Sequence, residues 1–487
     1  MKTPPFLALV ATLVLAAPAL AGREQADVLV RHATVVDVEH GRTLAGQAVA
    51  IRGGDIVAVG DDARLARAWQ AARTVDARGR YLIPGLWDMH VHFGGGPALV
   101  EENKALLPLY VAHGITTIRD ASGDLPEQVL SWRAQIADGR LFGPRLFTSG
   151  AKIEGIAPVW KGTLEAGDEA GVDAALDREQ RDGVDFVKIT DSTLKPDLFL
   201  YALREARKRG LRTSGHIPMA LTVGQAVDAG ISSIEHLDYA FKAGVADEAA
   251  IAADFAAGRI DRAEANHRLH AGFDRATAMA AYRRFAERGV AVTPTLDGGR
   301  IIDFLDVEPH DGDAYLAYIG PGLRKTYAWR VERAAKATPG QIAARHARYA
   351  DVAAVLPMLQ EAGVRIMAGT DAGFLNSYNY PGIGLHNELS LYVREGLTPA
   401  QALASATRAG PAWFGRLDRY GAVEAGKAAD LVLLERNPLE DIEAVRAIDT
   451  VILRGQVHDR AALDAMLAAV RTKVAGWNAA EATEGTH

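Results

Sequence analysis

The stretch LIPGLWDMHVH, residues 82–92, decides the fold of this chain. It is a short apolar run that ends in two histidines, His90 and His92. Positions i and i+2 of a strand share a face, so these two imidazoles project together and could chelate one ion. Imidazole nitrogen suits zinc and related divalent ions. The stretch therefore predicts a strand whose end carries a metal site.

Four later apolar runs have, at or next to their ends, residues that suit the same chemistry. His216 and His236 are single ligands on two later strands and could hold a second ion. Two dications repel each other, so an anion must bridge them, and Lys188 can supply it if carbon dioxide converts its amine to a carbamate. Asp371 is an anionic ligand that can also accept a proton from a metal-bound water. The runs are DFVKI (185–189), RTSGH (212–216), ISSIEH (231–236) and RIMAGTD (365–371).

This ordered set predicts two divalent metal ions, with Zn²⁺ as the expected metal. Zinc lowers the pKa of a bound water from about 15.7 to about 7, so hydroxide is available at neutral pH. A single His-x-His or a single lysine would be weak evidence in a chain with 14 histidines. The prediction depends on the whole set occurring in order, with each member in a short buried-looking run.

The region from residue 81 to 414 alternates apolar strand patterns with helical patterns, which is typical of a parallel α/β fold. We expect a (β/α)8 TIM barrel, because all the candidate ligands then fall at the C-terminal ends of strands, where such barrels place their active sites. The expected strands are LWDMHVH, TTIRDAS, RLFTSG, FVKIT, RTSGHI, SIEHL, VAVTPTL and RIMAGTD.

Both flanks of this region have a β texture. Residues 22–80 and 415–460 contain short β-branched runs, and we expect them to form one small β-sandwich. The connections 239–288 and 297–361 are longer than a barrel needs and could act as a lid or as an oligomer contact. Residues 461–487 are expected to form an amphipathic helix, ending near Trp477, and a frayed tail.

The motifs resemble those of the amidohydrolase superfamily, a set of (β/α)8-barrel metal hydrolases. PGLWDMHVH resembles its first barrel strand, AGTDAG its eighth, and the late segments LTPAQALASATRAGPAWFG and GAVEAGKAADLVLL are also similar. The resemblance is strongest to the imidazolonepropionase-like and prolidase-like branch, which includes dipeptidases. It implies that His90, His92 and Asp371 hold one ion and that His216 and His236 hold the other. Lys188 would bridge both ions.

We expect the chain to hydrolyse a C–N bond of a small carboxylate-bearing amide, either a dipeptide or an N-acyl amino acid. A hydroxide bridging the metals would attack, and Asp371 would be the catalytic proton acceptor. Tyr239 and Lys152 are candidates to bind the substrate carboxylate. His386 would either line the pocket or cap the following helix. Some dipeptidases of the similar branch carry a histidine just after the third strand, whereas RLFTSGAKIEG has Lys152 and no histidine.

Other functions remain open at this point. A lactonase, a phosphotriesterase or a cyclic-amide hydrolase of the imidazolonepropionase type would use the same hydroxide on another electrophile. A non-catalytic periplasmic protein that binds a metal or a ligand is the alternative of another class. Asp371 argues against it, because a passive site has no evident need for a proton acceptor. Asp88 and Arg119 are expected to have structural roles.

Composition and the N-terminus limit the partners. A net charge of −7 and the lack of a basic stripe argue against nucleic acid. Lys2 precedes the apolar run FLALVATLVLAAPALA, so residues 1–21 are expected to be a signal peptide cleaved after Ala21. The protein would then be exported, periplasmic or secreted, with no membrane contact after cleavage. The chain has no cysteine, which excludes disulfides and thiolate ligands, and a homo-oligomer stays open.

Overall fold

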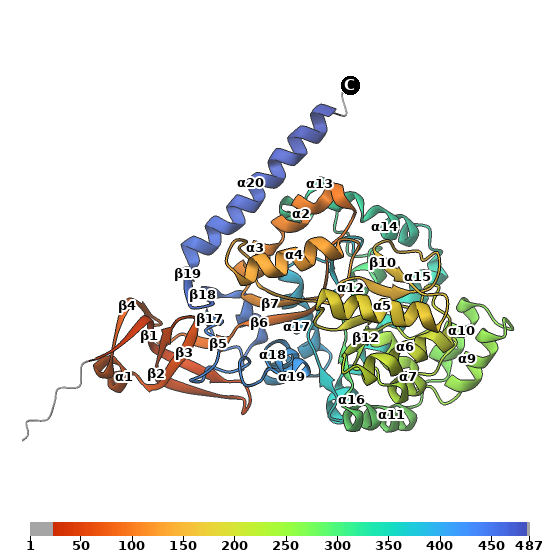
Figure 1. Ribbon diagram of the computed structural model, residues 1–487, viewed down its shortest axis with the longest axis horizontal. Coiled ribbons are helices and arrows are strands. Elements are labelled where there is room, and N and C mark those ends of the chain that lie inside the picture. The colour runs from red at the N-terminus through yellow and green to blue at the C-terminus, as the bar shows by residue number, and fades with distance from the viewer. Residues whose placement is uncertain (1–22, 485–487) are drawn as a thin grey trace, which may run out of the picture.

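The computed structural model describes residues 23–484, so the expected signal peptide lies outside the described residues. Figure 1 shows a β-rich part at one end of the molecule and a larger α/β part beside it. A long C-terminal helix, α20 (Arg460–Glu484), runs from the junction of these two parts along the α/β part.

The α/β part is built on parallel strands. Each of the eight expected strand stretches contains one observed strand, and the order along the chain is kept. These strands are β6 (Leu86–His92), β7 (Ile115–Asp120), β8 (Arg145–Thr148), β11 (Val187–Ile189), β12 (Thr213–Gly215), β13 (Ser233–Glu235), β14 (Ala291–Thr293) and β15 (Arg365–Ile366). Three further short strands are β9 (Lys152–Glu154), β10 (Thr163–Glu165) and β16 (Ala372–Gly373).

These strands form two parallel sheets that hydrogen bonds connect at both edges. The sheet orders are β16-β6-β7-β8 and β10-β9-β11-β12-β13-β14-β15. Asp185 N donates to Thr148 O at 2.9 Å, which joins β8 to the chain entering β11. Met89 N donates to Ala368 O at 2.9 Å, which joins β6 to the chain leaving β15. The result is a TIM-barrel-like α/β fold.

Helices cover the outside of this arrangement because each has one apolar face. In α6 (Pro196–Lys208) the buried side chains include Leu198, Ala202 and Ala206, at a spacing of four residues, and charged residues lie opposite. In α7 (Val223–Ala229), Thr222 and Gln225 form a reciprocal capping box. The other helices flanking the strands are α2 (Val100–Ala105), α3 (Leu107–Ala112), α4 (Pro126–Ala137), α5 (Glu169–Asp182), α17 (Ile383–Arg394), α18 (Pro399–Thr407) and α19 (Ala409–Phe414).

The β-rich part joins the two ends of the chain in one eight-stranded sheet. The join is antiparallel, with Leu433 of β17 opposite Leu82 of β5. Helix α1 (Asp62–Ala68) packs on this sheet, with Leu65 and Trp69 in its core. The strands are β1 (Glu24–Asp37), β2 (Arg42–Arg52), β3 (Asp55–Asp61), β4 (Trp69–Asp76), β5 (Tyr81–Pro84), β17 (Leu431–Leu434), β18 (Ile448–Leu453) and β19 (Gln456–Asp459).

Both long connections are helical. After β13 come α8 (Leu237–Lys242), α9 (Glu248–Ala256), α10 (Arg262–Ala271) and α11 (Arg275–Arg288). After β14 come α12 (Leu296–Asp303), the 3-10 turn η2 (Ala314–Tyr318), α13 (Pro321–Lys325), α14 (Ala328–Ala335), α15 (Pro339–Ala353) and α16 (Leu356–Glu361).

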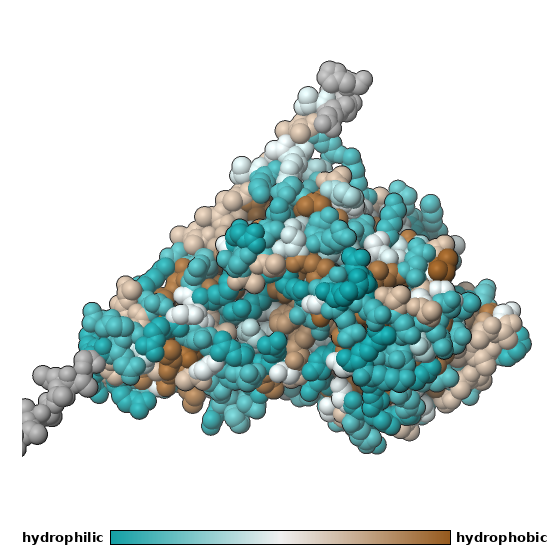
Figure 2. Space-filling view, viewed as in Figure 1, coloured by the Kyte–Doolittle hydropathy of each residue, from teal (hydrophilic) through white to brown (hydrophobic). Residues whose placement is uncertain are grey.

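The C-terminal helix is longer than expected. The helix α20 continues past Trp477 to Glu484, because the run AAEATE after Asn478 consists mainly of good helix formers and contains no glycine. Within residues 23–484, no helix combines the length and the apolar character needed to span a bilayer. The face drawn in Figure 2 is mostly hydrophilic, with small separate hydrophobic areas.

Candidate metal centre and its cleft

The six predicted ligand residues meet at the C-terminal ends of the strands. His90 Nε2 lies 3.1 Å from His92 Nε2, and His92 Nε2 lies 2.7 Å from Asp371 Oδ1. On the other side, His216 Nε2 lies 3.0 Å from His236 Nε2. Lys188 Nζ lies 3.4 Å from His216 Nε2. Potential ligand atoms of His90, His236 and Asp371 all lie within 4.8 Å of one another, so the two groups form one cluster.

Local backbone geometry turns two of these residues inward. His236 and Asp371 follow β13 and β15 with φ values of 71° and 66°, in a region that residues other than glycine rarely adopt. Hydrogen bonds hold both in place, from His236 N to Thr293 O at 2.8 Å and from Asp371 N to His90 O at 2.7 Å. Backbone strain of about 1–3 kcal/mol per residue often marks a functional site.

Outer hydrogen bonds orient the histidine rings. The fully buried Glu235 accepts a hydrogen bond from His90 Nδ1 at 2.7 Å and another from Arg119 at 2.7 Å. His92 Nδ1 contacts the carbonyl oxygen of Ser122, which can only accept. These acceptors place the proton on Nδ1 and leave each Nε2 lone pair directed into the cluster.

Burial favours the neutral imidazole at His90, His216 and His236, because it lowers the pKa of each. Burial, reinforced by the nearby Lys188 charge, lowers the pKa of His90 to about 3. Burial also lowers the pKa of Lys188 to about 8. Burial alone would raise the pKa of Asp371, but the hydrogen bond from His92 and the neighbouring imidazoles hold it well below its usual value.

This donor set fits divalent metal ions. It combines the imidazole nitrogens of four histidines with one ionised carboxylate. Arg119, which bonds to Glu235, also contacts two aromatic rings. Its guanidinium carbon lies 5.1 Å from the Phe186 ring centroid and 5.0 Å from that of Trp413. Arg119 and Asp88 are both fully buried and bond to other protein groups, as their expected structural roles require.

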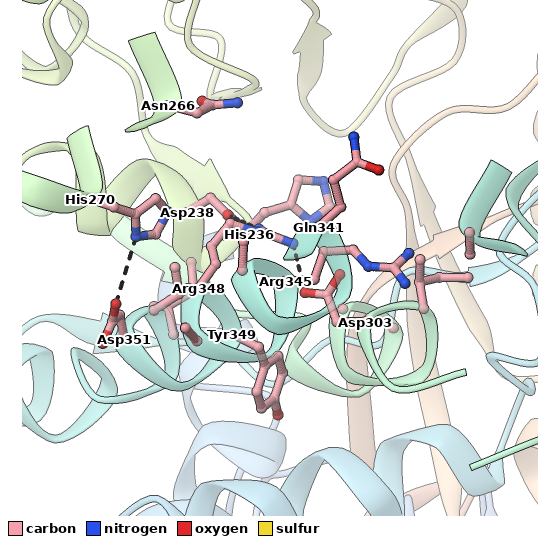
Figure 3. A pocket seen from close by; sticks show the side chains of 18 of the residues that line it. His236, Asp238, Asn266, His270, Asp303, Gln341, Arg345, Arg348, Tyr349 and Asp351 are labelled. Carbon is pink, nitrogen blue, oxygen red and sulfur yellow. Dashed lines mark hydrogen bonds and ion pairs between the residues drawn. The ribbon is translucent and has the colours of Figure 1, made fainter. Parts of the chain in front are cut away.

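A cleft of about 1030 Å³ opens from this cluster. His236 and Asp371 line it together with residues of α10, α12, α14 and α15. Figure 3 shows the cleft, with His236, Arg345 and Arg348 among the labelled side chains. A cavity of this size is within the range of small-molecule sites.

The three predicted substrate-binding residues have different positions. Tyr239 stacks on His216, with ring centroids 6.0 Å apart. Lys152 is buried on β9, and its Nζ lies 5.2 Å above the Trp160 ring. The structure does not bring His386 to the cleft. It lies inside α17, which begins after Gly382, and its Nε2 donates to His113 O at 2.9 Å.

Some residues of the site carry no clear signal in the sequence. Glu235 could have been recognised as a carboxylate within the apolar run ISSIEH. Thr295, whose Oγ1 lies 2.7 Å from His236 Nδ1, has no such signal. Arg330 and Arg345 also line the cleft, but in the sequence they resemble any other arginine on a charged helix.

Comparisons with known proteins identify the family of this chain. The model of the amidohydrolase family matches residues 81–458. The ochratoxinase of Aspergillus niger is 24% identical over 486 aligned residues, which cover 87% of this chain and 84% of that protein. The structure of bottromycin amidohydrolase aligns with a TM-score of 0.70 at 22% identity, covering 92% of this chain and 90% of that one. A Xaa-Pro dipeptidase structure aligns at 0.62 and 21% identity, covering 89% and 99%.

Proposed function

The chain belongs to the amidohydrolase family and is a hydrolase that acts on C–N bonds, and from this premise we propose that it cleaves the amide bond of a small carboxylate-bearing substrate with two divalent metal ions. The expected substrates are dipeptides and N-acyl amino acids. The observation that carries the proposal is the convergence of His90, His236 and Asp371, from three separate strands, within 4.8 Å.

The cluster divides naturally between two ions. His90, His92 and Asp371 would hold one ion, His216 and His236 would hold the other, and a carbamate on Lys188 would bridge them. Zinc is the expected metal, because the ligands are nitrogen and oxygen atoms that it binds well. Such ions, when bound, polarise a carbonyl group and lower the pKa of a water to about 7.

The residues of the chain then have defined roles. Asp371 is ionised in its surroundings, so it can accept a proton from the attacking water and pass it to the leaving nitrogen. Glu235 and Arg119 are positioning residues that fix the ring of His90.

Two residues are proposed to bind the substrate. The Lys152 ammonium makes no hydrogen bond or ion pair with any described residue. Burial lowers its pKa, and the charges of Glu154 and Asp120 act in the opposite direction. It is thus a free cation near the metal centre that could pair with a carboxylate. Tyr239 lies beside His216 and offers a hydroxyl group.

A lactonase or phosphotriesterase is the second candidate, because the same water could attack an ester carbonyl or a phosphorus centre. The names of similar proteins favour an amide substrate, since they include a Xaa-Pro dipeptidase and a putative prolidase.

The deciding experiment is a hydrolysis screen of dipeptides, N-acyl amino acids and lactones, using metal-loaded protein and the same protein after chelation. We expect turnover of amides by the loaded protein alone. Rapid turnover of lactones with none of any amide would overturn the substrate assignment in favour of the second candidate. The absence of turnover on all of these substrates would contradict the proposed substrate class.

We also propose that the protein is exported, on the basis of the sequence of residues 1–21. N-terminal sequencing of protein purified from its host should give Gly22 as the first residue. A protein that begins at Met1 would contradict cleavage.

A further inference from the structure

Three of the four acidic residues that line the cleft are paired with other groups. Asp238 and Asp303 each lie 2.6 Å from a guanidinium nitrogen of Arg348. Asp351 pairs with His270 at 3.9 Å, and the links from His270 to Asp351 and from Arg348 to Asp303 are drawn in Figure 3. Asp371 belongs to the metal centre. Asp238 and Asp303 are therefore paired with Arg348, whereas Asp351 makes only a long contact with His270.

The remaining cations of the cleft have no such partners. Arg330 and Arg333 on α14, Lys336 just after it, and Arg345 on α15 all line the cleft. None of these four makes an ion pair within the part of the chain that the structure describes. One wall of the cleft thus carries four cationic side chains that make no ion pair with a described residue.

Arg330 and Arg345 are the two members of this wall that have a buried donor atom without a partner among residues 23–484. Both are half-buried, and in each the Nε atom is buried without a hydrogen-bond partner among residues 23–484. An unsatisfied buried donor of this kind costs roughly 1–3 kcal/mol, so a site that carries two of them is suited to an acceptor from a ligand. Burial lowers the pKa of Arg330, and the charge of Asp371 acts in the opposite direction.

Contacts between aromatic rings connect Arg330 to Lys152. Its guanidinium carbon lies 5.4 Å from the ring centroid of Trp329, and Trp329 meets Trp160 edge-on at 6.3 Å. Lys152 lies on Trp160. The proposed carboxylate anchor Lys152 and Arg330 thus lie on either side of a pair of tryptophan rings.

We propose that Arg330 and Arg345 bind a second acidic group of the substrate, so that the enzyme selects dianionic amides such as N-acyl glutamates and acidic dipeptides. This inference rests on the proposed function. Lys152 would take the carboxylate next to the scissile bond, and the wall formed by α14 and α15 would take the second one. The cleft of about 1030 Å³ has room for such an extended substrate.

The test compares N-acetyl-L-glutamate with N-acetyl-L-glutamine, two compounds of nearly the same shape that differ by one negative charge. For the wild-type enzyme we expect KM for the glutamine compound to be higher by about 10- to 100-fold, the value of one charge-assisted hydrogen bond. In Arg330→Ala and Arg345→Ala, KM for the glutamate compound should rise by at least about tenfold, with kcat changed little. The ratio of the two KM values should then approach 1.

Two further variants serve as controls. Arg67→Ala removes an exposed arginine of α1 outside the cleft, so it should leave both KM values unchanged. Arg345→Lys keeps the charge and should retain part of the preference. Thermal melting of each variant checks that the fold is intact. Equal KM values for the two compounds in the wild type, or equal losses on both in the arginine variants, would overturn the proposal.

Calorimetric binding of the same two compounds to metal-free protein separates this inference from the proposed function. Preferential binding of the glutamate compound without hydrolysis of any amide would support the proposed anion-binding role of Arg330 and Arg345. It would contradict the proposed function. Hydrolysis of both compounds with equal KM would support the proposed function and contradict the anion-binding role of the two arginines. A failure of the glutamate compound to bind would also overturn the anion-binding role of Arg330 and Arg345.

Discussion

The carboxylate of Asp371 lies 2.7 Å from His92 Nε2 and 3.4 Å from His90 Nε2, so one side chain can be both a ligand and a proton acceptor. Asp371→Asn keeps an oxygen at this position but cannot accept a proton. We expect kcat to fall by about 10²–10⁴-fold, the usual contribution of a general acid–base group, while the melting temperature changes little. Wild-type turnover in this variant would mean that another residue is the base.

Lys188 is the residue on which the two-metal proposal depends most. Its amine is 1% exposed and lies beside His216, where a bridging anion is required. Lys188→Ala should lose bound metal and activity, and short carboxylic acids should restore part of both. Intact-mass measurements should show the added mass of one carbon dioxide in the native enzyme. A fully metallated and active enzyme with an unmodified amine would exclude the bridge.

Glu179 on α5 predicts a pH dependence of stability. It is 1% exposed, its Oε2 has no partner among the described residues, and burial raises its pKa from 4.5 to about 9. Between these two values the folded protein binds more protons than the unfolded chain, so stability falls as the pH rises. Glu179→Gln removes this loss. Its gain in unfolding free energy should reach at most about 3 kcal/mol at pH 7.

The measurement is the melting temperature of Glu179→Gln and of the wild type from pH 5 to pH 9. The difference between them should be small at pH 5 and should grow toward pH 9. A difference that does not change over this range would show that Glu179 is ionised in the folded protein.

At the scale of single residues, the sequence predicts the ligands well and the cleft wall poorly. His90, His92 and Asp371 stand out because each lies in a short apolar run, where a polar residue needs a purpose. Arg330 and Arg345 are buried only because α14 and α15 pack over the strand ends, which is a tertiary effect. The position of His386 could not be predicted from the sequence for the same reason, since its contact with His113 joins segments 273 positions apart.

At the scale of elements, α12 shows how distant helices support the metal centre. Its first N–H groups, at Leu296 and Asp297, donate to Glu388 of α17 at 2.8 and 2.7 Å. Thr295, just before α12, contacts His236 Nδ1. Glu388 therefore caps a helix that begins next to a proposed ligand.

Glu388→Ala should leave both N–H groups without an acceptor and lower the unfolding free energy by about 1–3 kcal/mol. Because Thr295 would lose its support, zinc affinity should fall as well. The control is Glu361→Ala on α16, which removes an exposed carboxylate that pairs with Arg275 and should have little effect. An unchanged melting temperature and zinc affinity in Glu388→Ala would show that Glu388 does not stabilise the metal centre.

Elements with a strong pattern are predictable, and those set by tertiary contacts are not. The eight expected strands appear in order because each is an apolar run between turn signals. The strands β9, β10 and β16 are not among the eight expected strands, and length does not distinguish them, because β11 to β15 also have only two or three residues. The end of α20 was predicted too early because helix-forming residues continue beyond Trp477.

At the scale of the whole molecule, the chain ends meet in one sheet through pairing of β5 with β17, which are about 350 positions apart. The β texture of both ends predicts that they belong together, but the register is fixed by tertiary packing. The order of the ligand runs along the chain predicts that their ends converge, since parallel strands around a barrel-like fold present their C-terminal ends on one face.

The most direct test of the account is a zinc titration of metal-free protein, with the rate of hydrolysis of an N-acyl amino acid as the readout. The cluster of His90, His92, Lys188, His216, His236 and Asp371 predicts that the rate rises with added Zn²⁺ and reaches a plateau at two equivalents per chain. Full activity of the metal-free protein, or no hydrolysis after two equivalents have bound, would contradict the two-metal hydrolase.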